Sequence, residues 1–367
     1  MKKIFIHAYM AGNLGDDLFV RVLCERYHNM TFRIIADDTY KKRFKDIHNL
    51  KVYSPDSFIV RAIDWIIYRQ KNKKRGFWKL MLKTSYATVH IGGSVFVQHA
   101  KNFSDAYELD NEIVTMSKRT YIVGANFGPF IDKKYYNDYY ELFKQYKGIV
   151  FRDRYSYGLF KELPNIKYAP DIIFNMKIKE KVPEKHQVLI SVIDMKNRNG
   201  EFGISQYSDM YQKFIVALSR QYLLLGYNVK FISFCKYQGD DKVIDEIIEL
   251  LKANENRISA CYYDYDFQIC LKSFIESEIV IGTRFHSVIL GLITGKKVLP
   301  IIYDSKTRNI LEDMGYDLFV ELECLEYHLR NMANLIERID EVQNVDVEKL
   351  RYEAQGQFSD LDKLFKR

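Results

Sequence analysis

The stretch from Ile279 to Lys306 reads IVIGTRFHSVILGLITGKKVLPIIYDSK and contains a complete β-α-β unit. Its first three residues are β-branched and predict a buried strand. The apolar run at 288–293 predicts a helix, which the glycine at 295 ends. Residues 298–302 predict a second strand. Because a helix connects the two strands, we expect a parallel, open α/β sheet.

Two side chains that can meet an anion follow the first of these strands. Arg284 and His286 lie at its carboxyl end, beside the start of the helix, and open α/β sheets bind ligands at such ends. An arginine and a histidine next to a helix N-terminus can bind an anion and supply a proton. Lys306, at the end of the second strand, is either a third cation of this site or an ordinary surface lysine.

A similar strand-to-helix turn, RDRYS at 152–156, is present in the first half of the chain. Its arginines are either exposed charges beside a helix capped by Asp153 or ligands of an anion. If the two halves face each other, Arg152 and Arg284 would hold one anion from two sides. Guanidinium groups suit this role because they bind carboxylate and phosphate in a bidentate manner.

Composition narrows the class of protein. The 367 residues carry a net charge of +7 and are 47% hydrophobic, which suits a globular protein with an anionic substrate or lipid surface and does not indicate nucleic acid. The five cysteines and eight histidines have no metal-ligand spacing, so we expect neither a metal nor another cofactor. Scattered, odd-numbered cysteines indicate reduced thiols in a cytoplasmic protein, and neither a signal peptide nor a membrane span is expected.

Strands alternate with helices in both halves of the chain, which predicts the α/β class with two Rossmann-like domains facing a cleft. We expect an N-terminal domain at 1–176, which contributes Arg152. A charged stretch around Pro183 looks like a linker. A C-terminal domain at 187–345 should carry the site, and 346–367 should form a helical tail.

Further candidate residues lie in loops that follow other strands. The loop after the first strand leads into a helix, where Asp16 and Asp17 either line a site or cap the helix. Adjacent glycines at 92 and 93 let the backbone approach a ligand closely. The candidate loop residues are Asn13, Gly15, Asp16, Asp17, Gly92, Gly93 and Asp171.

The segment 57–78 differs in character from the rest of the chain. Isoleucines at helical spacing, with Trp65 and Tyr68 nearby, precede a basic run at 69–75. Such a pattern suits peripheral contact with an anionic membrane. The commoner explanation is an ordinary amphipathic helix followed by a solvated basic loop.

Six motifs, in order over nearly the whole chain up to about residue 320, resemble those of the polysaccharide pyruvyl transferase family. One departure is Ser94, where the family usually has a third glycine. The motifs are NLGDD (13–17), IGGS (91–94), FRDRYS (151–156), APD (169–171), GTRFHS (282–287) and PIIYDSK (300–306).

The resemblance implies a fold like that of the type B glycosyltransferases and a pyruvyl transferase activity. The donor would be phosphoenolpyruvate, and the acceptor a sugar of a cell-surface polysaccharide or of its lipid-linked precursor. The product would be a ketal on two sugar hydroxyls, with phosphate released. By this resemblance Arg152 and Arg284 would bind the donor, and His286 would be the key catalytic histidine. We also expect Ser287 and Lys306 to contribute to donor binding and Arg284 to act beside His286 in catalysis. The acceptor would be served by the loop residues, and Asp16, Asp17 and Asp171 remain equal candidates for the base.

Two other functions are compatible with the sequence. One is a sugar-nucleotide-dependent type B glycosyltransferase, although residues 282–303 contain no carboxylate to hold a ribose. The other is a non-catalytic glycan-binding protein. Only the enzymes require His286 or Arg284 to be functional.

Overall fold

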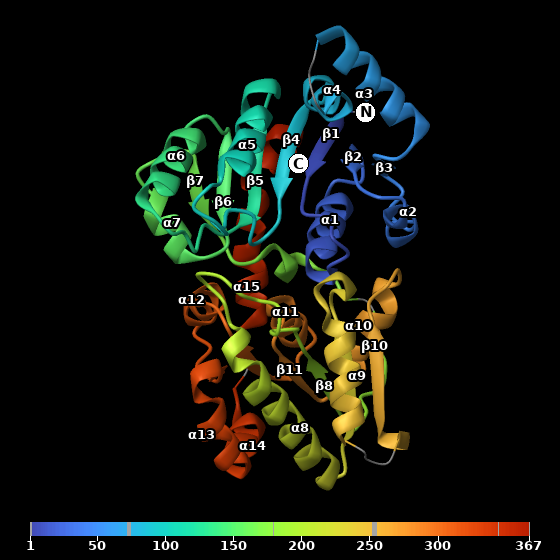
Figure 1. The fold of residues 1–367 in the computed structure, drawn as a ribbon, viewed down its shortest axis with the longest axis vertical. Helices are drawn as coiled ribbons and strands as arrows, with labels where there is room; N and C mark the ends of the chain where they lie inside the picture. Colours follow the sequence, from blue (N-terminus) through green and yellow to red (C-terminus); the bar gives the residue numbers. More distant parts are fainter. Residues whose placement is uncertain (1, 72–74, 179, 252–254, 344, 367) are drawn as a thin grey trace. The chain divides into compact units, whose positions relative to one another are not determined.

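The computed structural model describes residues 2–71, 75–178, 180–251, 255–343 and 345–366. Contacts divide the chain into two compact α/β units, each built around its own parallel sheet (Figure 1). Unit 1 comprises residues 1–10, 16–172 and 353–367, and unit 2 comprises residues 11–15 and 173–352. The units differ from the expected boundaries: the loop at 11–15 belongs to unit 2, unit 2 resumes at residue 173, and the expected tail is divided between the units after residue 352.

Unit 1 contains a sheet of seven parallel strands in the order β3-β2-β1-β4-β5-β6-β7. The strands are β1 (Lys3–His7), β2 (Thr31–Ile35), β3 (Leu50–Tyr53), β4 (Ala87–Ile91), β5 (Thr120–Ala125), β6 (Gly148–Phe151) and β7 (Ile166–Tyr168). The helices associated with it are α1 (Leu14–Arg26), α2 (Thr39–Arg43), α3 (Phe58–Lys71), α4 (Gly76–Thr84), α5 (Ser104–Met116), α6 (Lys133–Phe143), α7 (Arg154–Phe160) and α16 (Ser359–Phe365).

The middle of this sheet is fully buried, since every residue of β4, β5 and β6 is buried. A parallel sheet covered on both faces typically has such nearly continuous apolar strands. On one face Phe5 packs with Val60, Phe77 and Ile113, which come from α3, α4 and α5. These helices therefore form one layer over the β1 region.

The C-terminal residues join unit 1 through specific polar contacts. The Gln357 side chain accepts a hydrogen bond from the Gly124 amide (2.9 Å) and donates to the Ala169 carbonyl (2.7 Å). Arg26 of α1 forms an ion pair with Asp362 at 2.6 Å. These long-range contacts explain why residues 353–367 form no separate tail.

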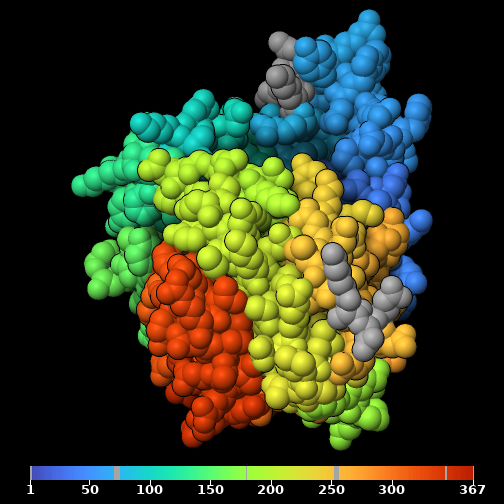
Figure 2. Space-filling model, turned by 60° about the horizontal axis from the view of Figure 1, so that its bottom comes forward, coloured from blue at the N-terminus to red at the C-terminus, as the bar shows by residue number. Residues whose placement is uncertain are grey.

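Unit 2 contains a sheet of six parallel strands in the order β10-β9-β8-β11-β12-β13. The strands are β8 (Gln187–Ser191), β9 (Asn228–Ser233), β10 (Ile258–Tyr262), β11 (Ile279–Gly282), β12 (Lys297–Ile302) and β13 (Val320–Glu321). Its helices are α8 (Ser208–Leu224), α9 (Asp240–Leu251), α10 (Phe267–Glu276), α11 (Phe285–Ile293), α12 (Ser305–Met314), α13 (Leu325–Arg330), α14 (Met332–Glu341) and α15 (Val347–Ala354), the last crossing into unit 1. Helix α8 packs against α13, and their surfaces adjoin in the view of Figure 2.

This strand order is that of a Rossmann sheet. The first three strands are added toward one edge of the sheet, and from the fourth strand on they are added toward the other edge, beginning beside the first strand. In unit 2 this change falls between β8 and β11. Ligands of such sheets bind outside the carboxyl ends of the strands at this switch point. The turn that carries Arg284 and His286 lies there.

The predicted α/β class and the β-α-β unit at 279–306 are confirmed, and β11, α11 and β12 match the expected segments within a few residues. All five cysteines are free thiols and four of them are buried, as expected of reduced core residues. Among the described residues, no helix has the length and apolar character that a membrane span requires.

Candidate functional site

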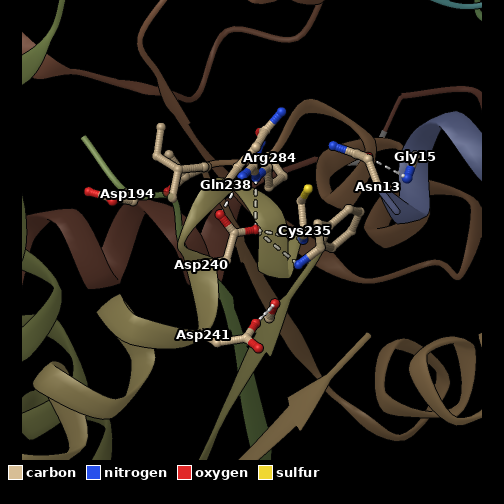
Figure 3. Close-up of polar contacts among 12 residues, drawn as sticks. Asn13, Gly15, Asp194, Cys235, Gln238, Asp240, Asp241 and Arg284 are labelled. Carbon is tan, nitrogen blue, oxygen red and sulfur yellow. Dashed lines mark hydrogen bonds and ion pairs between the residues drawn. The ribbon is translucent and has the colours of Figure 1, made fainter. Parts of the chain in front are cut away.

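The guanidinium of Arg284 is held by a buried carboxylate. Arg284 Nε donates to Asp240 Oδ2 at 3.0 Å, its Nη2 donates to Asp240 Oδ1, and its Nη1 donates to Gln238 Oε1 (Figure 3). The side chain is only 7% exposed. Burial by itself would lower the pKa of Arg284, but Asp240 outweighs it and the net pKa is raised. The site therefore has a permanent, rigidly oriented positive charge.

Asp240 comes from a different part of the chain, the loop after β9. Its Oδ2 also accepts hydrogen bonds from the backbone amides of Phe234 and Cys235, both at 3.0 Å. This carboxylate lies outside residues 282–303 and reaches Arg284 only through the pairing of β9, β8 and β11. No local signal in the sequence identifies it.

His286 is the second residue of α11 and is partly exposed. Its imidazole packs directly on the backbone of Gly15, because a Cβ placed on Gly15 would lie 1.9 Å from His286 Nδ1. The loop that carries Gly15 is fixed to unit 2 by the Leu14 amide, which donates to the Phe234 carbonyl at 2.9 Å. Only glycine fits this close approach.

Asn13 shapes the same loop. Its Oδ1 accepts a hydrogen bond from the Gly15 amide at 2.8 Å, which forms a turn at the start of α1. Asp16 and Asp17 lie inside the first turn of that helix, and Asn13 immediately precedes it. The alternative in which one of the two aspartates caps the helix is therefore wrong, because α1 begins at Leu14, earlier than the periodicity predicts.

Ser287 is fully buried and turned toward the backbone. Its Oγ donates to the Arg284 carbonyl at 2.6 Å. This contact stabilises the first turn of α11. Ser287 therefore has a structural contact in the turn that carries Arg284 and His286.

Lys306 lies at the start of α12, with its Nζ 3.4 Å from Asp304 Oδ2. Asp304 caps α12 by accepting hydrogen bonds from the Thr307 amide (2.8 Å) and hydroxyl (2.7 Å). Burial opposes ionisation of Asp304, but Lys306 and Thr307 outweigh it and lower its pKa. The lysine is therefore one partner of a local ion pair after β12, the strand next to β11.

Unit 1 has its own buried arginine at the end of β6. Arg152 Nη1 donates to Asp171 at 2.9 Å, and its Nη2 donates to Asn126 Oδ1 at 2.8 Å. A Cβ on Gly93 would lie 2.5 Å from this guanidinium. The structure therefore brings Gly93, Arg152 and Asp171 into one cluster. Asp171 has no exposed surface, which makes it a weak candidate for the acceptor base.

The remaining candidates of unit 1 lie apart from this cluster or beside it. Asp17 is 3% exposed, and its carboxylate lies 3.7 Å from the Arg43 guanidinium. Asp16 is partly exposed. Gly92 has a φ of +152°, a conformation that favours glycine. Asp153 caps α7 by accepting from the Ser156 amide at 2.7 Å, which was one of the two alternatives for this turn. The exposed charge that went with that alternative holds for Arg154 but not for Arg152, which is 4% exposed.

The two units, each with its own parallel sheet, give the chain a fold like that of the type B glycosyltransferases. The UDP-GlcNAc 2-epimerase of Neisseria meningitidis aligns over 100% of both chains with a TM-score of 0.60 and 8% identity. That of Methanocaldococcus jannaschii aligns over 94% of both chains with a TM-score of 0.57 and 12% identity. MurG of Acinetobacter baumannii aligns over 100% of both chains with a TM-score of 0.50 and 11% identity.

Within that class, residues 13–305 match the model of the polysaccharide pyruvyl transferase family, and the chain belongs to this family. The amylovoran biosynthesis protein AmsJ of Erwinia amylovora is 20% identical over 262 residues. The match covers 64% of this chain and spans 60% of the length of AmsJ.

Proposed function

We propose that this protein transfers the pyruvyl group of phosphoenolpyruvate to two hydroxyls of a sugar in a cell-surface polysaccharide or its precursor. One observation carries the proposal beyond the family: a partly exposed histidine next to a fixed, charged arginine at the switch point of unit 2. A donor with a carboxylate and a phosphate needs such a charge. The name of AmsJ, an amylovoran biosynthesis protein, supports a polysaccharide acceptor.

The proposed reaction adds one proton to the methylene carbon of phosphoenolpyruvate and removes one proton from each of two sugar hydroxyls. His286, as imidazolium, would give its proton to the methylene carbon of phosphoenolpyruvate, leaving an oxocarbenium-like carbon. A sugar hydroxyl would add to that carbon and phosphate would leave. The second hydroxyl would then close the ketal. Of the two protons released by the hydroxyls, one restores the imidazolium and the other leaves with phosphate.

The hydrogen bonds of Arg284 to Asp240 and Gln238 engage three of its five N–H donors. We assign Arg284 to orienting the donor anion beside the first turn of α11, where a helix N-terminus favours negative charge. Its own charge is held in place by Asp240. A donor role for Lys306, Ser287 and Arg152, and a base among Asp16, Asp17 and Asp171, remain hypotheses for mutagenesis.

The decisive experiment compares donors on the purified protein. Phosphate release from phosphoenolpyruvate that depends on a host glycan, with a pyruvate ketal found in that glycan by mass spectrometry, is the expected result. The competing activity is a sugar-nucleotide transferase, since the solved relatives of the fold include proteins with bound UDP-GlcNAc. Glycan-dependent release of UDP from a UDP-sugar, with no turnover of phosphoenolpyruvate, would replace the proposal by that activity.

We further propose that α3 rests on an anionic membrane that carries a lipid-linked acceptor. This helix exposes an apolar face, with Phe58 at 86%, Ile59 at 65% and Trp65 at 58% exposure. The opposite face is occupied, because Val60 is buried and Asp64 accepts a hydrogen bond from the Phe77 amide. A helix with an apolar face and basic flanks binds at a lipid interface.

Basic charge is present beside this face. The guanidinium of Arg69 lies 5.0 Å from the ring centre of Trp65. Arg61 is also exposed, in an ion pair with Asp56 at 2.5 Å. Part of the predicted basic run, residues 72–74, lies outside the described residues. The charge next to an apolar ridge favours anionic lipid over an uncharged protein surface.

Sedimentation with vesicles tests this contact. Wild-type protein is expected to sediment with vesicles containing phosphatidylglycerol and not with phosphatidylcholine vesicles. The double variant Phe58→Ser/Trp65→Ser should lose binding, whereas Leu224→Ser, at a residue of unit 2 that is 79% exposed, should retain it. Equal binding by both variants would reject the role of α3.

A further inference from the structure

Unit 1 contains a group of three metal-ligating side chains that the proposed reaction does not use. His7 ends β1, His90 lies on β4, and Asp110 comes from α5. His7 and His90 are partners in the parallel register of the two strands. Their rings lie side by side, with centroids 4.6 Å apart.

The two histidines belong to the same face of the sheet, and α5 places a carboxylate against them. His90 Nδ1 is 3.4 Å from Asp110 Oδ1. One ligand atom from each of the three residues lies within 4.8 Å of the others. A tetrahedral zinc ion with bonds of about 2.1 Å has neighbouring ligand atoms about 3.4 Å apart. The separation of the histidine nitrogen and the carboxylate oxygen therefore already matches such a site.

A second observation is an unsatisfied polar atom. His90 is 4% exposed, and its Nδ1 is buried without a hydrogen-bond partner among the described residues. Buried polar atoms of this kind are rare in native proteins and call for an explanation such as an ion. A metal ion between His90 and Asp110 would supply the missing partner.

The surroundings resemble those of a built metal site. The Tyr139 hydroxyl donates to the second oxygen of Asp110 at 2.8 Å, which orients the carboxylate. Trp78 and Phe96 pack against the two imidazoles. Burial lowers the pKa of His7 to about 4 and also lowers the pKa of His90.

We propose that His7, His90 and Asp110 bind a divalent transition-metal ion of the zinc type. No sequence pattern marks this site, because its ligands are far apart in the chain and follow no ligand spacing. The ion would tie β1, β4 and α5 together at the strand ends of unit 1. Three protein ligands would leave one coordination position for water.

The test uses the full chain without a histidine tag, stripped with a chelator and titrated with Zn²⁺ and Co²⁺. We expect about one equivalent of tightly bound metal by elemental analysis, a rise in Tm on adding Zn²⁺, and the visible absorption of tetrahedral Co²⁺. His90→Gln and Asp110→Asn should lose all three signals. His28→Gln, at an exposed histidine, and His286→Gln should retain them.

Two results would overturn the proposal. One is a wild-type protein that binds no metal. The other is Asp110→Asn or His90→Gln binding one equivalent as the wild type does, which would place the ion elsewhere. Because asparagine reproduces the shape of Asp110, the Asp110→Asn variant decides the matter if His90→Gln fails to fold by circular dichroism. The result is independent of pyruvyl transfer, since only metal binding and stability are measured.

Discussion

The two sheets have similar switch points but different chemistry beside them. Between β8 and β11 of unit 2, a buried Arg284–Asp240 ion pair lies next to a partly exposed His286. Between β1 and β4 of unit 1, two neutral histidines lie against Asp110, and burial raises the pKa of Asp110 to about 7. The first switch point contains an ionised arginine–aspartate pair. At the second, burial shifts the pKa values of the histidines and of Asp110 toward the neutral forms. Topology thus provides a location, and the side chains decide its chemistry.

The two buried arginines differ in the residue that comes next in the chain. Arg152 and Arg284 each follow a strand, β6 and β11 respectively, and each pairs with a buried aspartate. After Arg152 the next residue, Asp153, caps α7 with its carboxylate. After Arg284 the first turn of α11 contains His286 and no acid. The difference favours the second turn for the proposed anion site, because no side-chain carboxylate from that turn occupies the helix N-terminus.

The largest expected effect is on chemistry at His286. His286→Ala should lower the turnover of phosphoenolpyruvate by about 10²- to 10⁴-fold, because a positioned acid contributes on that order. The Tm should change little, because the side chain is partly exposed. Steady-state phosphate release measures the effect, and His28→Ala is the matched control. Activity within about tenfold of wild type would remove His286 from the mechanism.

Next in size is the loss of stability from breaking either buried ion pair. Arg284→Ala and Arg152→Ala should each destabilise their unit by about 3–5 kcal/mol, because each leaves a buried carboxylate uncompensated. Urea unfolding monitors both. The double variant Arg284→Met/Asp240→Asn should be more stable than Arg284→Ala, since it removes the orphaned charge and keeps an oxygen that can accept from the Phe234 and Cys235 amides. If the double variant is the less stable of the two, the pair does not act as a unit.

A smaller effect is expected from Gly15→Ala. The added methyl would occupy the position of the His286 ring, so the imidazole must shift. We expect kcat to fall by about ten- to a hundredfold, on the scale of a misplaced catalytic group, with a small change in Tm. Gly158→Ala is the control, because a Cβ there meets nothing within 4 Å. Equal kcat values for the two variants would contradict the close packing of Gly15 on His286.

The smallest effect concerns acid stability at the cap of α12. The pKa of Asp304 is lower in the folded chain than its ordinary value, so its contribution to stability is present at neutral pH. That contribution is lost as the pH falls through the folded-state pKa. Asp304→Asn keeps a capping side chain but removes the charge. The variant should be less stable than wild type at about pH 7, and the difference should shrink toward about pH 3.

Urea midpoints at the two pH values measure this last effect. Asp313→Asn, on the same helix, serves as a charge-matched control. A difference between Asp304→Asn and wild type that stays constant over the whole pH range would show that the charge of Asp304 does not stabilise the fold.

Local sequence patterns were sufficient to predict the fold class, both sheets and the turn at 282–287. These features depend on β-branched runs, helical periodicity and glycine at turns. The capping role of Asp153 was likewise predictable, because a cap acts on its own helix within three residues. The candidate histidine and arginines followed from their positions after strands, and the family motifs assigned roles to them.

The contacts between side chains that are distant in the sequence became known only from the tertiary structure. Asp240 reaches Arg284, and His7 reaches His90, through the pairing of strands that are distant in sequence. Gly15 reaches His286 because its loop belongs to unit 2, although it follows a strand of unit 1. The physical reason is that local propensity fixes where elements begin and end, whereas register and burial select contacts between elements. Those contacts hold Arg284 against Asp240 and bury His7 and His90 beside Asp110.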